Sequence, residues 1–590
     1  MAKWMVAAKK ADFDAIATKY HITPILARIL RNRDLIEEEE LQKFLYGELS
    51  DLHNPLLMKG MEAAVEIILT KIKEGAHIRV IGDYDVDGIC ATYILSQGIQ
   101  KLGGLVDTVI PHRMKDGYGL NDSLIEAASN EGINLIITCD NGIAAASQIQ
   151  LAKSLGMNVV VTDHHEIPYE VLEPNQEHHY ILPEADAVVD PKQQDCTYPC
   201  KFICGAVVAY KLVQALLLKS KCTFTEDDFL PFAALATVCD VMELRDENRI
   251  IVREGLSRME HSINLGLKAL LLACGLEGKK LSPYHAGYIL GPCLNASGRL
   301  DTAGRALKLF AELDWKSAVT QAEDLKSLND SRKLMTETGV QEAIALVENT
   351  EIRQDQVLVI YLPECHESLA GIIAGRIKEK YGKPTFVLTK GEEGIKGSGR
   401  SIESYSMYEE LNACKEFLTK FGGHKMAAGV ALADESAIEQ FRKQLNENCT
   451  LTQNDFEEII HIDVPMPLSC ADKAFVKELS LLEPFGTGNP KPLFARKGIS
   501  LLSGKKIGKN RTIGKFKIAE EGSPVFDMIY FGDLEQLDAF LTEQFGADKV
   551  AELYQRNLQR GEMPISMAYY PELNVYAGQE NIQIMMQSYC

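Results

Sequence analysis

The stretch RVIGDYDVDGI, residues 79–89, decides the fold because it ends an apolar run in a cluster of acids and glycines. The run before the acids is short, β-branched and apolar, which is typical of a buried strand. Asp83 and Asp85 follow it, and Gly82 and Gly88 flank them. Only a small residue lets the backbone approach a metal or a phosphate closely. The stretch therefore predicts a buried strand whose end delivers carboxylates to a metal site.

Two later runs repeat this pattern. NLIITCDNGI delivers Asp140, and NVVVTDHHE delivers Asp163, His164 and His165. A helix-like stretch follows each run, and this alternation predicts a parallel, doubly wound sheet. Ligands of such sheets bind in the crevice outside the carboxyl ends of the strands, so we expect these side chains to converge on one cleft.

Three further segments extend the set. LVDTVIPHR delivers His112 and Arg113, and ADAVVDPK delivers Asp190. The later apolar segment FAALATVCDVMEL adds Asp240, which we also expect at the end of a strand.

A site with two metal ions fits these residue types. Hard cations such as Mg²⁺ and Mn²⁺ prefer carboxylate oxygen, and imidazole shifts the preference toward Mn²⁺ or later metals. Two cations can activate water and stabilise both oxygens of an in-line phosphoryl displacement. One acid alone could equally be a helix cap or a turn residue, but five ligands at strand ends predict a phosphodiesterase with Mn²⁺ or Mg²⁺. The predicted ligands are Asp83, Asp85, Asp140, His164 and Asp240.

The same strings resemble a known family. DYDVDG, CDNG and TDHHE match successive motifs of the DHH phosphoesterase superfamily, and TVCDVMEL resembles its fourth motif. Downstream, GPCLNASGRL, CHESLAGIIAGRI, GSGRSI and FGGHKMAAG resemble the RecJ branch, the single-strand-specific exonucleases. The resemblance runs from about residue 40 to the C-terminus, and its motifs are long and ordered.

The resemblance also implies roles for single residues. It implies the same five metal ligands, with Asp163 and His165 as catalytic residues that orient the ligand imidazole or contact the leaving oxygen. A terminal 5′ phosphate in the substrate site would set 5′ to 3′ polarity, and arginine suits this site because its fork donates two parallel hydrogen bonds. The implied substrate-binding residues are Arg113, Arg299, His366, Ser398, Arg400 and His424.

Two groups of cysteines are left open. The family commonly has Gly-Pro-Arg where this chain has Gly-Pro-Cys, with Cys293 in place of the arginine. Another residue must therefore contact the phosphate or acid that the arginine would bind. Cys196, Cys200 and Cys204 recur every four residues. Zinc sites usually pair cysteines two to four apart and need a fourth ligand, so buried small hydrophobes are the favoured interpretation and a metal site is the alternative.

Composition and charge narrow the possible classes of protein. At a net charge of −21 the chain has no general field that attracts nucleic acid, so basic groups must act locally. No apolar run approaches the roughly 18–20 residues of a membrane span, and the first residues lack the apolar region of a signal peptide. We expect a cytoplasmic monomer without membrane contact, which binds single-stranded DNA and has a helicase or a single-strand-binding protein as candidate partners.

The predicted fold class is α/β with a C-terminal β domain. We expect the connecting helix to be long and to break near Asn329, and we expect glycine-rich turns at KGSGRS and FGGHKMAAG to line an anion site. The predicted parts are a helical lead-in (1–60), a DHH catalytic domain with a parallel sheet (61–305), a connecting helix (306–350), a smaller α/β substrate-binding domain associated with DHH (351–450) and an OB-fold-like β-barrel that binds single strands (455–590).

These features predict a metal-dependent 5′ to 3′ exonuclease that hydrolyses single-stranded DNA to mononucleotides in repair and recombination. One alternative is a DHH phosphodiesterase for oligoribonucleotides or cyclic dinucleotides, which the long linker, the GPCLNASGRL motif and the C-terminal β domain argue against. A second alternative is a catalytically inactive replication scaffold, which the retained acids and histidines argue against.

Overall fold

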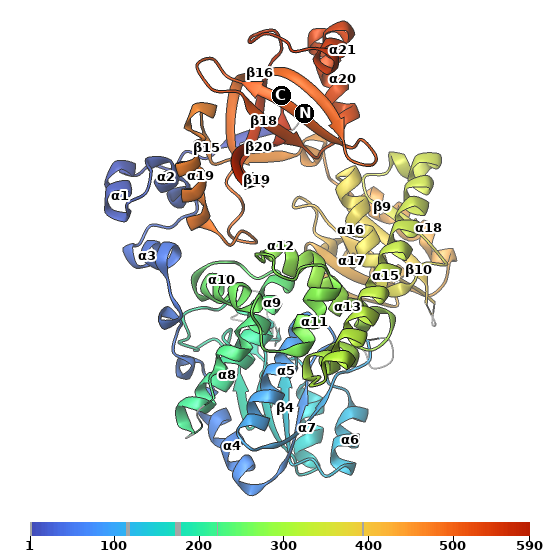
Figure 1. Ribbon diagram of the computed structural model, residues 1–590. Coiled ribbons are helices and arrows are strands. Elements are labelled where there is room, and N and C mark those ends of the chain that lie inside the picture. The colour runs from blue at the N-terminus through green and yellow to red at the C-terminus, as the bar shows by residue number, and fades with distance from the viewer. Residues whose placement is uncertain are drawn as a thin grey trace. The chain divides into compact units, whose positions relative to one another are not determined.

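The computed structural model describes residues 3–113, 119–170, 179–220, 222, 224–391, 394–576 and 578–590 (Figure 1). The chain forms two compact units. The catalytic unit comprises residues 52–243 and 247–456, and the terminal unit comprises residues 1–51, 244–246 and 457–590. Within the described residues, no helix is long and apolar enough to cross a membrane.

A five-stranded parallel sheet lies in the catalytic unit. Its strands are β2 (His77–Ile81), β3 (Leu105–Val109), β4 (Leu135–Cys139), β5 (Asn158–Thr162) and β8 (Ala187–Val189). Their order is β3-β2-β4-β5-β8 and all neighbours run parallel, which confirms the predicted sheet. The order reverses between β2 and β4, so the carboxyl ends of these two strands form the switch point where such sheets bind ligands.

Helices cover both faces of this sheet. Those on one face are α4 (Met61–Glu74), α5 (Val86–Lys101) and α8 (Gly205–Lys219), and those on the other are α6 (Asp122–Asn130) and α7 (Ala146–Ser154) (Figure 1). Helix α5 is buried along most of its length because it packs on the sheet, on α8 and on α9 (Leu230–Cys239). This buried helix begins directly after the acids of the first motif and fixes their position.

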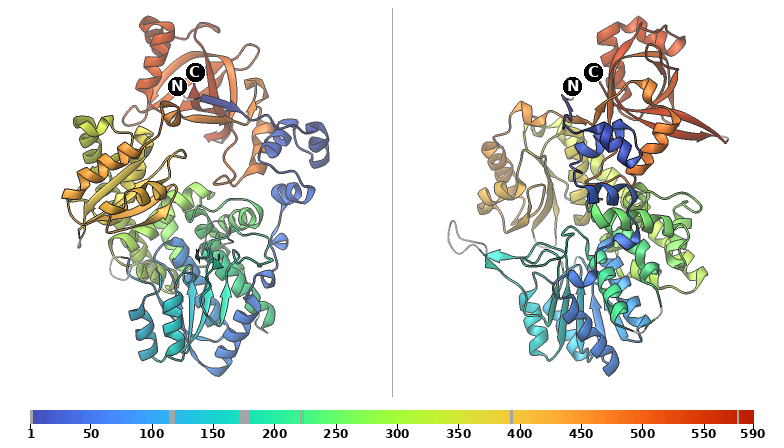
Figure 2. Two further views of the ribbon diagram at one scale, coloured as in Figure 1. Left: turned by 180° about the vertical axis from the view of Figure 1, so that it is seen from behind. Right: turned by 90° about the vertical axis from the view of Figure 1, so that its left-hand side faces the viewer.

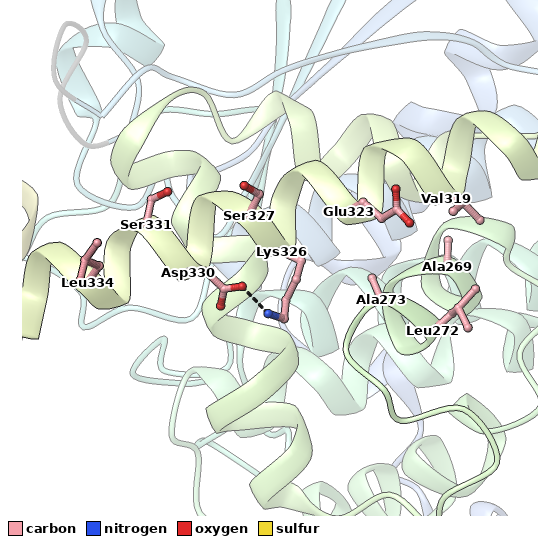
Figure 3. Close-up of a pocket in the computed structure, with 10 residues that line it drawn as sticks. All are labelled: Ala269, Leu272, Ala273, Val319, Glu323, Lys326, Ser327, Asp330, Ser331 and Leu334. Atoms are coloured by element: carbon pink, nitrogen blue, oxygen red, sulfur yellow. Dashed lines mark hydrogen bonds and ion pairs between the residues drawn. The ribbon is translucent and has the colours of Figure 1, made fainter.

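The connecting helix α15 (Trp315–Asn349) is continuous over 35 residues. The predicted break near Asn329 is wrong, because Asn329 is buried within the helix and its side-chain N–H donates to the Cys293 sulfur at 3.3 Å. Helix α15 packs on α11 (Leu265–Ala273), and a hollow of about 640 Å³ lies between them (Figure 3). The Lys326–Asp330 ion pair lines this hollow, but none of the predicted site residues does.

A second, smaller sheet follows α15. Its strands are β9 (Leu358–Tyr361), β10 (Thr385–Lys390), β11 (Ile395–Arg400), β12 (Lys420–His424) and β13 (Ala427–Leu432). The order is β12-β13-β11-β10-β9, with only β9 and β10 parallel. The glycines of the expected turns therefore lie in strands, with a short turn between β12 and β13. The sheet is tight at Gly397, where a Cβ would lie 2.7 Å from the carbonyl oxygen of Val387.

Five strands of the terminal unit close into a ring. They are β16 (Phe494–Ile507), β17 (Ile513–Ala519), β18 (Phe526–Tyr530), β19 (Pro564–Tyr576) and β20 (Gln579–Tyr589). The pairs run β16-β17-β18-β20-β19, and β19 also pairs with β16 (Figure 2). This closed ring agrees with the predicted OB-like barrel.

The N-terminal helices pack into the same unit as this ring. They are α1 (Phe13–Tyr20), α2 (Pro24–Asn32) and α3 (Glu38–Tyr46). Leu26, Leu30 and Phe44 share one apolar core with Leu482 and Phe494. A short strand, β1 (Lys3–Val6), also pairs in parallel with β14 (Ile459–Ile462). The segment predicted as a lead-in thus belongs structurally with the C-terminal strands.

Candidate metal centre and phosphate pocket

The strand ends bring the predicted acids to one edge of the parallel sheet. Asp83 lies two residues beyond β2, Asp140 directly follows β4, and Asp163 directly follows β5. Asp240 instead caps the C-terminus of helix α9, so its predicted position at a strand end is wrong. Helix α9 is apolar and buried on all sides, and a buried helix shows the same continuous apolar run as a buried strand.

His164 lies at the centre of the acids. Its Nε2 is 3.0 Å from Oδ1 of Asp140, 3.6 Å from Oδ2 of Asp87 and 3.8 Å from Oδ2 of Asp240. The side chain is only 6% exposed. Three carboxylates thus converge on one imidazole nitrogen within a buried space.

The ligand atoms form three overlapping groups, each with its atoms within 4.8 Å of one another. Asp140 belongs to two of the groups, and so does His164. Asp140 therefore lies where it could contact two ions. All five predicted metal ligands fall in these groups. The first group is Asp83, Asp85 and Asp140, the second is Asp87, His164 and Asp240, and the third is Asp140, His164 and His165.

Sequence reasoning did not assign a role to Asp87. Its two carboxylate oxygens accept hydrogen bonds from the backbone N–H groups of Gly205 and Ala206 at 2.6 and 2.7 Å. These amides begin helix α8, where the helix dipole favours a negative charge. A Cβ at Gly205 would lie 2.7 Å from Cβ of Asp140, so glycine permits this close approach. The available signal was the two-residue spacing of the three acids in DYDVDG.

The backbone around the acids is tightly constrained. Asp85 caps helix α5 and accepts hydrogen bonds from the N–H groups of Asp87 and Gly88 at 2.9 and 3.1 Å. A Cβ at Gly88 would lie 2.5 Å from the backbone of Asp83, which confirms the need for glycine there. Asp140 has a φ of +61°, an uncommon conformation for a residue with a side chain. Such conformations concentrate at functional sites.

Asp163 holds His165. Its Oδ1 lies 2.7 Å from Nδ1 of His165, and its Oδ2 accepts the Ile143 N–H at 2.9 Å. Burial raises the pKa of Asp163, but the hydrogen bond and charge of His165 outweigh burial, so the net pKa is below its usual value. Burial lowers the pKa of His165, but the hydrogen bond and charge of Asp163 outweigh burial and raise the pKa to about 9. This pair can orient a group beside the ligands, which is the role predicted for it.

The crowded acids need a cation. Burial and the charge of Asp85 raise the pKa of Asp83 to about 7, and burial and the charge of Asp87 raise that of Asp240 to about 8. Among the described atoms, Asp83 Oδ1 and Asp240 Oδ2 are buried without a hydrogen-bond partner. Buried oxygens that lack a donor and repel one another fit a hard divalent cation.

A cavity of about 410 Å³ is lined by Tyr84, the residue after Asp83, and by residues of the second sheet. Arg113 and Ser398 line it, with Tyr84 from the first motif. The guanidinium of Arg113 lies 4.8 Å from the centre of the Tyr84 ring. Two of the predicted phosphate-binding residues therefore face one cavity next to the acids.

Other arginines surround this region. Arg299 donates to the carbonyl oxygen of Ser368 at 2.7 Å. Burial, together with the charges of Arg113, Arg332 and Arg400, lowers the pKa of Arg299 to about 10. Sequence reasoning missed Arg332, because it is one of many charges on helix α15 and carries no distinctive pattern. This concentration of half-buried positive charge suits a phosphate group.

Comparison with known proteins identifies the family. Family models match residues 77–237 (DHH family, N-terminal domain), 354–450 (DHHA1 domain) and 462–588 (RecJ OB domain). The single-stranded-DNA-specific exonuclease RecJ of Escherichia coli is 32% identical over 593 residues, which cover 96% of each chain. The chain belongs to the RecJ family. RecJ of Bacillus subtilis is 36% identical over 541 residues, covering 90% of this chain and 66% of the relative.

A solved RecJ structure has the same fold. The crystal structure of RecJ from Thermus thermophilus in complex with Mn²⁺ matches with a TM-score of 0.80 and 26% identity. The match covers 100% of this chain and 79% of the Thermus chain. A further Thermus RecJ structure contains Mg²⁺.

The two predicted substrate histidines are not among the residues that line the cavity. His366 caps a short helix (Glu367–Leu369), and its Nδ1 lies 2.8 Å from Oγ of Ser368. His424 is exposed at the end of β12, where its Nδ1 accepts the Met426 N–H at 3.2 Å. Neither lines the cavity, so their contact with substrate stays a prediction.

Cys293, which stands where the family commonly has arginine, lies in a buried environment. Cys293 is fully buried, with its sulfur 3.7 Å from the Cys274 sulfur and in contact with the Asn329 amide. Asn329 in turn accepts a hydrogen bond from Arg332 at 3.0 Å. The buried cysteines of the other cluster, Cys196, Cys200 and Cys204, belong to none of the ligand groups found among the described residues.

Proposed function

We propose that this RecJ-family chain is a metal-dependent exonuclease that hydrolyses single-stranded DNA from the 5′ end to mononucleotides, in DNA repair and recombination. The observation that carries this proposal is the convergence of five carboxylates and His164 in one part of the catalytic unit, which also has a cavity lined by Arg113. The names of the relatives, single-stranded-DNA-specific exonucleases, support the substrate.

The metal centre would hold two ions of Mn²⁺ or Mg²⁺. When bound, the ions activate water and stabilise the charge of the attacking and leaving oxygens. Solved RecJ structures with each metal support this choice. The side chains that would hold the ions are Asp83, Asp85, Asp87, Asp140, His164 and Asp240.

The protein side chains would position the strand and move the proton. Arg113, Arg299 and Arg400 would bind the terminal 5′ phosphate, because an anion relieves the repulsion among their half-buried charges. Ser398 would donate to the same phosphate from the cavity wall. His165, held by Asp163 at 2.7 Å and kept protonated by it, could donate a proton to the leaving oxygen.

End-labelled oligonucleotides test the proposal. The purified protein with Mn²⁺ should release mononucleotides from the 5′ end of a single strand and leave a blunt duplex of the same sequence largely intact. Release from the 3′ end, or faster cleavage of oligoribonucleotides or cyclic dinucleotides, would favour the other DHH phosphodiesterases. No hydrolysis of any of these substrates with either metal would favour the inactive scaffold.

We propose that the protein is a cytoplasmic monomer and that a helicase or a single-strand-binding protein assists it. We also propose the domain boundaries that the sequence predicts. We also propose that the ring of strands in the terminal unit grips single-stranded DNA, because OB domains bind about 4–16 nucleotides through a basic groove and stacked bases.

A further inference from the structure

Two tyrosines of the catalytic unit stack on each other at the protein surface. The rings of Tyr284 and Tyr288 have their centres 5.3 Å apart and their planes at 22°. Tyr284 is 61% exposed and Tyr288 is 72% exposed. A stacked pair that remains this exposed buries little apolar surface, so the pair contributes little to the stability of the fold.

These tyrosines lie on a helical segment that packs against helix α9. They belong to a short helix (Pro283–His285) and a π-helical turn (Ala286–Leu290), and π-helical turns often occur at functional sites. The sulfur of Cys239 contacts the carbonyl oxygen of Ala286 at 3.6 Å. Cys239 directly precedes Asp240, so the turn that carries Tyr288 packs against the end of the helix that supplies a metal ligand.

The same helical segment leads to the phosphate pocket. Helix α13 (Gly291–Leu300) continues from the π-helical turn and carries Arg299 in its last turn. Arg299 lies eleven positions after Tyr288, which corresponds to about 16 Å along a helix. One rigid element thus carries the stacked tyrosines at its start and a phosphate-binding arginine at its end.

Positive charge lies next to the tyrosines. Lys279 and Lys280 are exposed in the loop that precedes this helix. The ring of His285 lies 5.9 Å from that of Tyr284, and the charge of Lys279 adds to burial in lowering the pKa of His285. In a chain with a net charge of −21, lysines beside exposed aromatic rings form a local site for a polyanion with flat bases.

We propose that Tyr284 and Tyr288 form a base-stacking platform for the part of the single strand on the 3′ side of the cleaved link. The proposal rests on the proposed function, because the 5′ phosphate at Arg299 sets the direction of the strand. Stacking tolerates any base, which suits an enzyme that digests a strand without regard to sequence. Each stacked base contributes about 5- to 100-fold in affinity.

Fluorescence of 2-aminopurine tests the platform without depending on cleavage. The base is placed at successive positions from the 5′ phosphate of a 20-nucleotide strand, which is bound to the Asp140→Asn protein with Mn²⁺. We expect quenching at one or two internal positions, its loss in Tyr284→Ala/Tyr288→Ala, and its retention in Tyr284→Phe/Tyr288→Phe. Unchanged quenching at every position in the double alanine variant would overturn the proposal.

Kinetics in the otherwise unmodified protein provide a second measurement. The double alanine variant should raise KM for a 20-nucleotide strand by about 5- to 100-fold, with kcat at saturating DNA little affected. Leu313→Ala is the control, since Leu313 is 88% exposed and lies outside the site. A KM change no larger than that of Leu313→Ala would also contradict the platform. If the parent protein does not digest 5′-phosphorylated single strands, the proposed function fails, and the fluorescence result still decides the platform.

Discussion

Oδ1 of Asp140 lies 3.0 Å from Nε2 of His164, and these two residues are shared between the groups of metal-binding side chains. Replacing either by alanine should therefore disrupt both ion positions. We expect Asp140→Ala and His164→Ala to lose several orders of magnitude in nuclease rate. Binding of single-stranded DNA should stay measurable, because the phosphate pocket is intact. A folded variant that cuts at more than about a tenth of the parent rate would argue against this arrangement.

Asp87 provides a prediction that the sequence alone did not suggest. Asp87→Asn removes a negative charge that two backbone N–H groups hold toward His164. We expect weaker Mn²⁺ binding by calorimetry and at least about a hundredfold loss of rate. Asp190→Asn is the matched control, because Asp190 is also a buried acid but lies outside the three ligand groups. Equal losses in the two variants would show that Asp87 has no special role.

Arg400→Ala should weaken the preference for a 5′ phosphate. A charge-assisted hydrogen bond contributes about 1.5–3 kcal/mol, or roughly ten- to a hundredfold. Rates on 5′-phosphate and 5′-hydroxyl strands measure the preference. Arg376→Ala is the control, since Arg376 is exposed and pairs with Glu337 at 3.2 Å. An unchanged ratio of the two rates in Arg400→Ala would remove this arginine from the phosphate site.

Deletion of the terminal unit should raise KM for long strands and reduce processivity, yet spare slow hydrolysis of very short oligonucleotides. The fragment 52–456 retains every side chain of the metal centre. A fragment 1–455 would be a poorer choice, because Leu26, Leu30 and Phe44 would lose the apolar core that they share with later residues. We expect 1–455 to melt at a lower temperature and to aggregate more than 52–456. Unchanged KM and processivity in folded 52–456 would assign the ring of strands another role.

The strand ends were predictable because parallel strands impose a simple rule. A short apolar run followed by an acid locates the sheet edge, and this rule placed Asp83, Asp140 and His164 together correctly. The ring of strands was predictable from alternating segments separated by turn residues. In both cases the local pattern determines the position in space.

The remaining features depend on contacts between distant segments. Asp240 follows a buried helix whose apolar run is indistinguishable from that of a strand. Asp87 gains its orientation from the first amides of α8, more than a hundred residues later. The glycines of β11 lie in a strand because the neighbouring strand approaches closely, which no local turn pattern reveals.

Titration of metal-stripped protein with Mn²⁺ tests the central claim most directly, with ion binding and release of mononucleotides from a 5′-phosphorylated single strand measured on the same samples. The account predicts no release without metal, two ions bound per chain at saturation, and activity that rises with occupancy. It also predicts that Asp140→Ala neither binds both ions nor cuts. Full activity in the stripped protein, or undiminished ion binding by Asp140→Ala, would contradict the account.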